Sequence, residues 1–207
     1  MSIMDLTANS YYLDVLKEVG NIGAGNALTA LSQIINKKVD MEVPVIEVIE
    51  TEKIVNTVET AEMLIVGVYV KFWGDISGNI MLVLDKPSAD HLIKILLGGV
   101  SENDFYSEME MSAIQEIGNI LSSSYINSIS QLSNLNIQMS VPSVSIDMAA
   151  SILSVPAIEY SEVSDRIILI ENKILEGDNE IVGNLYFMPD LDSFKRLFSN
   201  LGVPIDE

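Results

Sequence analysis

The chain has 207 residues, of which 48% are hydrophobic, so it is long enough to bury a substantial core. Its 30 acidic residues against 11 basic ones give a net charge of −19, which disfavours binding to nucleic acid or to an anionic membrane surface. The absence of cysteine and the single histidine, His91, exclude disulfides, thiol chemistry and any metal site built from several histidines or cysteines.

The start of the chain lacks the basic segment and long apolar run of a signal peptide. The most apolar stretch, residues 63–70, is too short to span a bilayer. We therefore expect a soluble cytoplasmic protein that does not cross a membrane.

The first predicted element is a helix over residues 10–36. Its apolar residues recur at spacings of three or multiples of three, close to the helical period, namely Leu13, Leu16, Val19, Leu28, Leu31 and Ile34. Gly20, Gly23 and Gly25 lie inside this helix, and each costs up to about 1 kcal/mol relative to alanine. Glycines at this density indicate that another backbone or a partner approaches the helix closely.

Three predicted strands and a helix complete the first half. Residues 39–49 alternate apolar and other residues, as a half-buried strand does. Residues 63–72 and 76–84 are β-branched, aromatic or apolar enough to form strands. A helix follows Pro87, with Ser88 or Asp90 available to cap its first turn.

The second half predicts a similar order of elements. A helix begins near Ser107, where Glu110 lies three residues on and completes a capping box. Residues 165–171 and 181–188 again have the composition of strands.

The two halves share a motif at a constant offset of 98 residues. Residues 14–21 read DVLKEVGN and residues 112–119 read SAIQEIGN. In each half 22 residues separate the motif Asn from the proline of a Val-Pro pair, Pro44 or Pro142. A lone Glu-x-x-Asn carries little information, but its recurrence at the same distance from the same Val-Pro pair indicates a duplicated unit.

A second resemblance between the halves lies later in each copy. Residues 74–85 resemble residues 179–190 at an offset of 105, which indicates an insertion of seven residues near 172–180. We predict one domain over residues 1–207, made of two repeats at about 8–99 and 106–203 that are related by a pseudo-two-fold axis.

The motif residues share one face of each predicted helix. At 100° per residue, Glu18 lies about 40° from Asp14 and Asn21 about 20° from it on the other side. The second copy places Ser112, Glu116 and Asn119 in the same way. On a single helix these residues would be read as a solvated face, but the recurrence of the Glu-x-x-Asn pair, while neighbouring positions change, favours a functional role over a purely structural one.

The chemistry of this pair is that of an incomplete site. An Asn carboxamide donates and accepts hydrogen bonds, which suits it to orient a water molecule. Hydrolysis of a phosphoryl group depends mostly on such positioning and on electrostatics. A Glu carboxylate is repelled by phosphate, but it can pair with a basic residue beside a phosphate on a partner. Each helix therefore offers half of an active site that another protein completes.

The full motif consists of Asp or Ser, then three residues, Glu, two residues, Asn, 22 residues and Pro. Through this motif the chain resembles the CheC family of chemotaxis phosphatases, which is related to CheX and to the middle domains of FliM and FliY. The motif fits twice without departure, and the stretch NIGAGNALTALSQI at 21–34 is also typical of CheC-like proteins. The resemblance implies an α/β fold, a pseudo-two-fold duplicated α/β/α sandwich with a largely antiparallel central sheet and two long exposed motif helices.

The resemblance also implies the reaction, which is hydrolysis of the aspartyl phosphate of the response regulator CheY. By carry-over, Asn21 and Asn119 position the attacking water, and Glu18 and Glu116 pair with a basic residue of the regulator. Asp14 and Ser112 lie at the rim of the contact. The Mg²⁺ of the reaction belongs to the regulator, and this chain has no cofactor or metal of its own.

Members of the family also bind the receptor deamidase CheD, which raises their activity. The resemblance directs attention to a short surface helix over residues 146–155, with four candidate contact residues: Asp147, Ala149, Ala150 and Ser151. The same segment can instead be a connector between strands with one partly buried face.

Two alternatives to the phosphatase remain open from the sequence. One is a FliM-like module that binds the regulator or serves as a scaffold without catalysis. The other is an unrelated acidic protein whose duplication is purely architectural. Exposure of the motif helix faces distinguishes them, because an architectural role would bury Asn21 and Asn119.

Overall fold

The computed structural model describes residues 10–100, 105–161 and 166–203 of the chain. Its first half contains α2 (Ser10–Ile35), β1 (Asp40–Met41), β2 (Val45–Glu50), the 3-10 helix η1 (Thr51–Thr57), β3 (Leu64–Gly74), β4 (Gly78–Asp85) and α3 (Lys86–Leu97). Its second half contains α4 (Glu108–Ser133), β5 (Ile137–Met139), β6 (Ser143–Met148), α5 (Ala149–Ser161), β7 (Arg166–Glu176), β8 (Asn179–Pro189) and α6 (Leu191–Asn200). The order of elements is therefore nearly the same in both halves.

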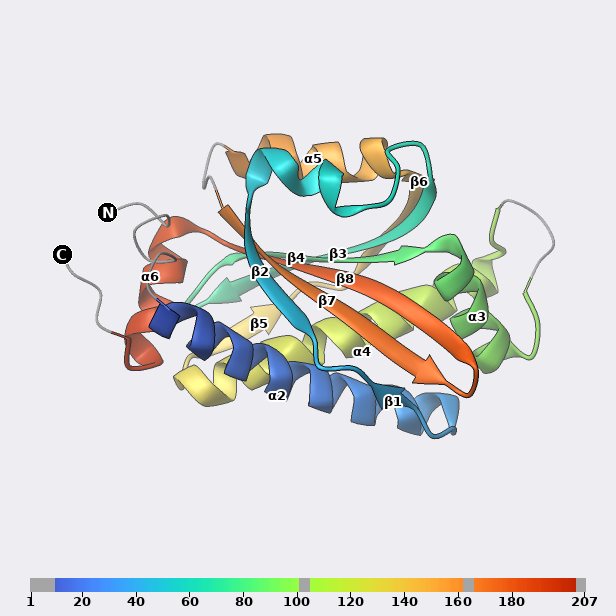
Figure 1. Cartoon of the computed structure of the whole chain (residues 1–207), viewed down its shortest axis with the longest axis horizontal. Helices are drawn as coiled ribbons and strands as arrows, with labels where there is room; N and C mark the ends of the chain where they lie inside the picture. The colour runs from blue at the N-terminus through green and yellow to red at the C-terminus, as the bar shows by residue number, and fades with distance from the viewer. Residues whose placement is uncertain (1–9, 101–104, 162–165, 204–207) are drawn as a thin grey trace.

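One curled antiparallel sheet contains all the strands of the described residues (Figure 1). Its order is β1-β7-β8-β4-β3-β5, with β2 also paired to β7 and β6 also paired to β3. Strands β4 and β8 lie at the centre, and the first strands of each half cross over to pair with the long strand of the other half. This reciprocal exchange joins the strands of both halves in one sheet.

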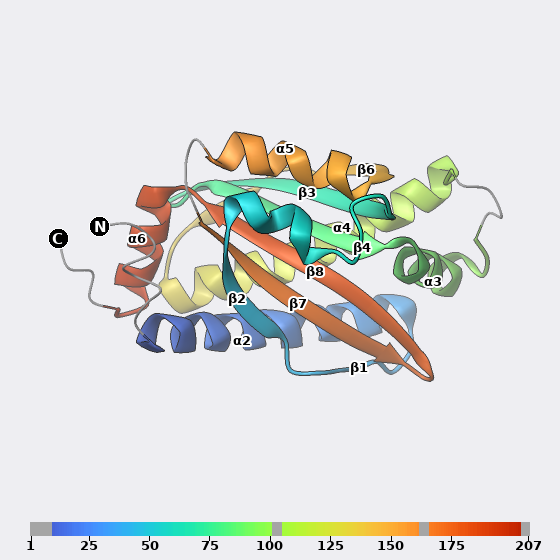
Figure 2. The ribbon, with the colours of Figure 1, turned by 45° about the horizontal axis from the view of Figure 1, so that its top comes forward.

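Helices cover both faces of this sheet. Alternate residues of β3 point to opposite sides, so that Val66 and Val68 join the larger core beneath α2 and α4, while Ile65 joins a second core beneath α5 and η1. Figure 2 shows α2 and α4 along one face and α5 on the other. The predicted α/β/α sandwich with two long motif helices is confirmed.

Two of the three predicted glycines of α2, Gly20 and Gly23, allow close packing, but their neighbours are side chains of this chain rather than another backbone, and Gly25 faces open space. A Cβ atom at position 20 would overlap with Ile46, and one at position 23 would overlap with Tyr125 of α4. The amide of Asn26 also donates a 3.0 Å hydrogen bond to the Ser128 hydroxyl, which joins the two motif helices directly.

The helix starts show one confirmed cap and one corrected cap. The Ser107–Glu110 capping box at the start of α4 is present, with the Glu110 carboxylate accepting from the Ser107 backbone N–H at 2.7 Å. For α3 the cap is neither Ser88 nor Asp90, because the helix begins before Pro87 and Asp85 caps it. A proline is accepted in the first helical turn, so the cap lies on its N-terminal side.

The two halves share this capping arrangement. Asp85 accepts a hydrogen bond from the Ser88 backbone N–H at 2.7 Å, and Asp190 accepts one from the Ser193 backbone N–H at 2.7 Å at the start of α6. The sequence comparison pairs Asp85 with Asp190, and both cap the last helix of their half.

The predicted strand over 39–49 is interrupted by Pro44, which lies between β1 and β2. The insertion predicted near 172–180 lengthens the β7–β8 hairpin. Pairing of β4 with β8 ends at Leu84–Gly183, whereas β7 and β8 continue paired to Glu176–Asn179. Strand β1 pairs with this extension. Within the described residues, no helix is both long enough and apolar enough to cross a bilayer.

Candidate active site

The first set of motif residues lies on the outer side of α2. Asp14, Glu18 and Asn21 are exposed, whereas Leu16 and Val19 are buried. Contact between Gly20 and Ile46 brings the helix against the sheet at this point. Because Asn21 follows Gly20 directly, its side chain is turned about 100° away from that contact and into solvent.

Helix α4 repeats this arrangement. Ser112 and Glu116 are exposed and Asn119 is half-buried. Gly118, the residue before the motif Asn, lies against Val68 of β3. The Ser112 hydroxyl donates a 2.8 Å hydrogen bond to the Glu108 carbonyl, so it is already engaged within the helix.

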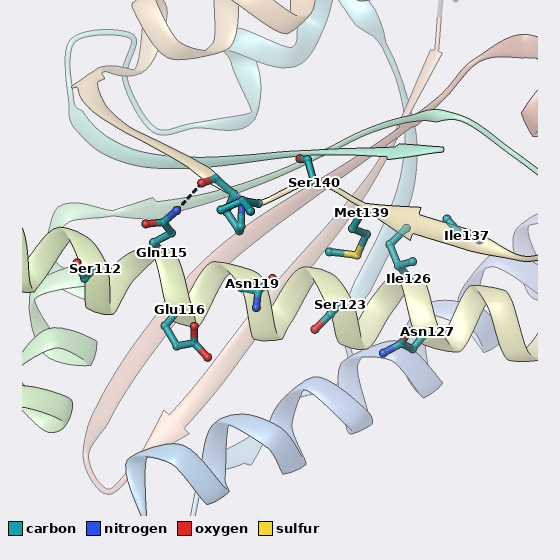
Figure 3. Close-up of a pocket in the computed structure, with 12 residues that line it drawn as sticks. Ser112, Gln115, Glu116, Asn119, Ser123, Ile126, Asn127, Ile137, Met139 and Ser140 are labelled. Carbon is teal, nitrogen blue, oxygen red and sulfur yellow. Dashed lines mark hydrogen bonds between the residues drawn. The ribbon is translucent and has the colours of Figure 1, made fainter. Parts of the chain in front are cut away.

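A groove of about 660 Å³ runs beside the motif residues of α4 (Figure 3). Its helical side carries Glu116 and Asn119, and the segment from β5 to the start of β6 forms the opposite side. The lining residues are Ser112, Gln115, Glu116, Asn119, Ser123, Ile126, Asn127, Ile137, Met139, Ser140, Val141 and Pro142. A carboxylate and a carboxamide therefore stand opposite a largely apolar wall.

One hydrogen bond joins the two sides of the groove. The Gln115 amide donates to the Pro142 carbonyl at 2.8 Å, as the dashed line in Figure 3 shows. Sequence reasoning did not single out Gln115, because the equivalent residue 98 positions earlier is Lys17 and the repeat gives no signal there. The available clue to Gln115 was the recurrent proline, because its constant distance from the motif Asn indicates that it lies close to the motif helix.

The motif side chains can orient and polarise, but they do not include a nucleophile and base in contact. Among the residues that the structure describes, no group of three His, Asp or Glu side chains is placed to hold a metal ion. His91 bonds Glu176 at 3.0 Å, and Glu176 accepts a further bond from Lys37 at 2.7 Å. The Lys37 hydrogen bond holds the pKa of Glu176 below its ordinary value. These three residues do not line the groove.

The second predicted surface, at residues 146–155, consists of the end of β6 and the first half of α5, and α5 covers the face of the sheet away from the motif helices. It is not a single helix, because β6 continues to Met148 and α5 begins at Ala149. Asp147 and Ser151 are exposed and Ala150 is half-buried, but Ala149 is fully buried in the second core. Any partner on this surface contacts Asp147 and Ser151 rather than Ala149.

Comparison with known proteins agrees with this geometry. The CheC-like family matches the chain at residues 12–48 and 109–146, which contain most of both motif helices. The chain is 32% identical over 198 residues to the CheY-P phosphatase CheC of Bacillus subtilis, covering 93% of this chain and 95% of that protein.

Two solved structures show the same fold. The structure of Thermotoga maritima FliY has a TM-score of 0.75 and 23% identity, covering 91% of this chain and 94% of that chain. A CheX–CheY–BeF₃–Mg²⁺ complex from Borrelia burgdorferi contains a chain with a TM-score of 0.50 and 14% identity, covering 80% of this chain and 93% of that chain.

A curled antiparallel sheet that carries two adjacent long helices, each with a Glu-x-x-Asn pair on its outer side, defines a class of protein with the same motif in two copies. The match to B. subtilis CheC extends over nearly all of both chains. The chain belongs to the CheC-like family.

Proposed function

We propose that this protein is a hydrolase that removes the phosphoryl group from the aspartyl phosphate of the chemotaxis response regulator CheY. One observation carries the proposal. The Glu-x-x-Asn pair occurs on the outer side of two neighbouring helices, in a chain whose relative over 93% of its length is a CheY-P phosphatase.

The proposed reaction is a displacement at phosphorus by water. The Asn21 or Asn119 carboxamide holds the water in line with the phosphoryl group, which is the main requirement of this chemistry. The water oxygen forms a bond to phosphorus as the bond to the regulator's Asp oxygen breaks, and the products are a free Asp carboxylate and inorganic phosphate. The Glu18 or Glu116 carboxylate pairs with a basic residue of the regulator and fixes the approach.

The proposal assigns the metal of the reaction to the partner. The phosphoryl oxygens need a compensating positive charge, which Mg²⁺ bound to the regulator supplies. The solved CheX complex contains CheY and Mg²⁺ together, which supports this assignment. The role of this chain is then limited to positioning the water and the regulator.

A scaffold without catalysis is the alternative. It would need a surface for the regulator, but it would not need a carboxamide one turn beyond a carboxylate in both repeats. Glu18 and Asn21 are exposed and do not contribute to the core, and Glu116 and Asn119 line a groove. These exposures favour the phosphatase over an architectural duplication.

We also propose that the receptor deamidase CheD docks on the far face of the sheet, at Asp147 and Ser151, with the half-buried Ala150 between them and Ala149 supporting them from the core. The support for this docking is the exposure of these side chains and their separation from the motif helices. Both proposed partners, CheY and CheD, fit the cytoplasmic location that the sequence predicts.

The decay of phosphorylated CheY tests the phosphatase directly. Wild type should accelerate the decay, and a folded Asn21→Ala/Asn119→Ala variant should return it to the regulator's own rate. Asn56→Ala is the matched control, because Asn56 is exposed in η1 on the other face of the sheet. A scaffold would bind the phosphorylated regulator and leave its decay unchanged in every variant.

A further inference from the structure

Each repeat contains a β-bulge at its motif proline. Residues 140–142, between β5 and β6, face only residues 70–71 of β3, and residues 42–44, between β1 and β2, face only residues 172–173 of β7. The pairs that flank the two bulges are Met139–Phe72 and Ser143–Tyr69, and Met41–Ile174 and Val45–Glu171. A bulge with one extra residue bends its strand and redirects a side chain, and bulges are frequent beside active sites.

The middle residue of each bulge is an outward-pointing valine. Val43 is 79% exposed and Val141 is 77% exposed, and they occupy equivalent positions 98 residues apart. A single exposed apolar residue needs no explanation. The two valines are equivalent and almost equally exposed, and the same kind of β-bulge turns each of them outward, which indicates that both have the same role.

The valine of the second repeat is held rigidly by its neighbours. The Ser140 backbone N–H donates to the Lys71 carbonyl at 2.8 Å, and the Gln115 amide donates to the Pro142 carbonyl at 2.8 Å. Val141 therefore lies between two anchored residues. A residue before proline is confined to extended conformations, and a β-branched side chain has few rotamers. Val141 loses little conformational freedom when a partner covers it.

The first repeat shares part of this anchoring. The Glu42 backbone N–H donates to the Lys173 carbonyl at 3.0 Å, which is the counterpart of the bond from Ser140 to Lys71. Lys17 takes the place of Gln115 in this repeat, so the anchor on the proline carbonyl differs between the repeats.

Val141 belongs to the same groove as the motif residues. It lines the groove together with Glu116 and Asn119, and Ile137 and Met139 extend the apolar wall on its side. A regulator that brings its phosphoryl group to Asn119 necessarily comes close to Val141. The occupant of this wall is therefore the protein that carries the phosphoryl group.

We propose that Val43 and Val141 are specificity-determining docking residues, each packing on an apolar part of the response regulator beside its aspartyl phosphate. Gln115 is a positioning residue that acts on Val141 through the Pro142 carbonyl. This inference rests on the proposed phosphatase function, and it assigns to the Val-Pro pair of the motif a role in recognition rather than in chemistry.

The test compares steady-state hydrolysis of phosphorylated CheY, without CheD, by wild type and by Val43→Thr/Val141→Thr. Threonine keeps the branched shape and replaces one methyl group by a hydroxyl, so the fold should be retained at these exposed positions. The loss of apolar contact at the edge of the site should raise KM at least about fivefold and leave kcat within about twofold. Val155→Thr is the matched control, since Val155 is 52% exposed on α5, away from the groove.

Single variants assign the effect to each repeat. Val141→Thr should raise KM when Asn21→Ala has disabled the first site, and Val43→Thr should do so when Asn119→Ala has disabled the second. Gln115→Met, which removes the donor to Pro142, should also raise KM without lowering kcat, whereas a merely structural role would lower the stability and leave KM unchanged.

Three outcomes decide between the proposals. An active wild type with an unchanged KM in the double valine variant overturns this inference and leaves the phosphatase standing. An equal rise of KM in Val155→Thr also overturns it, since the effect would then not be local. A folded wild type that does not accelerate the decay overturns the proposed function and, with it, the docking role.

Discussion

Gly118 packs directly against Val68, and this contact sets how closely α4 lies on the sheet beside Asn119. A Cβ atom at position 118 would overlap with the Val68 side chain. We expect Gly118→Ala to lower the free energy of unfolding by about 1–3 kcal/mol through overpacking, although alanine is the better helix former. Chemical denaturation measures this change. The displaced helix should also lower the phosphatase activity of the second site.

Gly25→Ala is the matched control for this stability measurement. Apart from its chain neighbours and the backbone of its own helix, no described atom lies within 4 Å of the position that a Cβ atom would take at Gly25, so the substitution meets open space. The higher helix propensity of alanine should leave the protein equally stable or up to about 1 kcal/mol more stable. If Gly118→Ala behaved like Gly25→Ala, the close packing of α4 on β3 would be wrong.

The second prediction concerns a buried hydrogen bond between α4 and β7. The Tyr125 hydroxyl donates to the Asn172 side-chain oxygen at 2.6 Å, and both residues are buried. Burial raises the pKa of Tyr125, so its hydroxyl remains a donor at physiological pH. Tyr125→Phe leaves the Asn172 oxygen without this donor and should destabilise the fold by about 1–3 kcal/mol.

A double-mutant cycle checks the origin of that cost. In Tyr125→Phe/Asn172→Val both polar partners are replaced by apolar groups, so the destabilisation should be smaller than the sum of the two single effects. Additive effects would show that the hydrogen bond itself contributes little.

Much of the fold follows from local sequence patterns. The helix predicted over 10–36 is observed as Ser10–Ile35, and the capping box at Ser107 marks the start of α4. The exchange of β2 and β6 between the halves could not be predicted, because each strand pairs with a partner at least 74 residues away (143 − 69 for Ser143 and Tyr69). The bulges depend on the same distant pairing, which is why residues 39–49 read as one strand.

The site was predicted in part, for a similar reason. The repeat identifies Glu18, Asn21, Glu116 and Asn119 without reference to structure, because it compares the chain with itself. The groove is formed where residues 137–142 fold back onto α4, and no local pattern encodes that contact. Ala149 was misjudged as a contact residue because α5 is apolar on most sides, so its sequence does not reveal which side faces the core.

The third prediction ranks the two sites. The motif residues of α4 lie in a groove, where an apolar wall can hold the regulator beside Asn119. Asn21 on α2 is more exposed than Asn119, so water around it is less constrained. We expect Asn119→Ala to remove the larger share of the acceleration of CheY-P decay. A larger loss in Asn21→Ala, with both variants folded, would reverse this ranking.

The last prediction concerns the dependence of stability on pH. Glu176 at the end of β7 accepts hydrogen bonds from Lys37, which follows α2, and from His91 in α3. The Lys37 hydrogen bond is the main cause that lowers the pKa of Glu176 below its ordinary value of 4.5, and His91 adds to it against the opposing effect of burial. A carboxylate whose pKa is lower in the folded state stabilises the fold above its unfolded pKa, and this stabilisation is lost as the pH falls through the folded value.

Wild type should therefore lose stability below about pH 4.5, and Glu176→Gln should lose less over the same range. Denaturation midpoints of wild type, Glu176→Gln and Lys37→Met between pH 3 and pH 7 measure this, with Lys37→Met expected to fall between the other two because His91 still contributes. Parallel curves for wild type and Glu176→Gln would contradict the link between this ion pair and the stability of the extended hairpin.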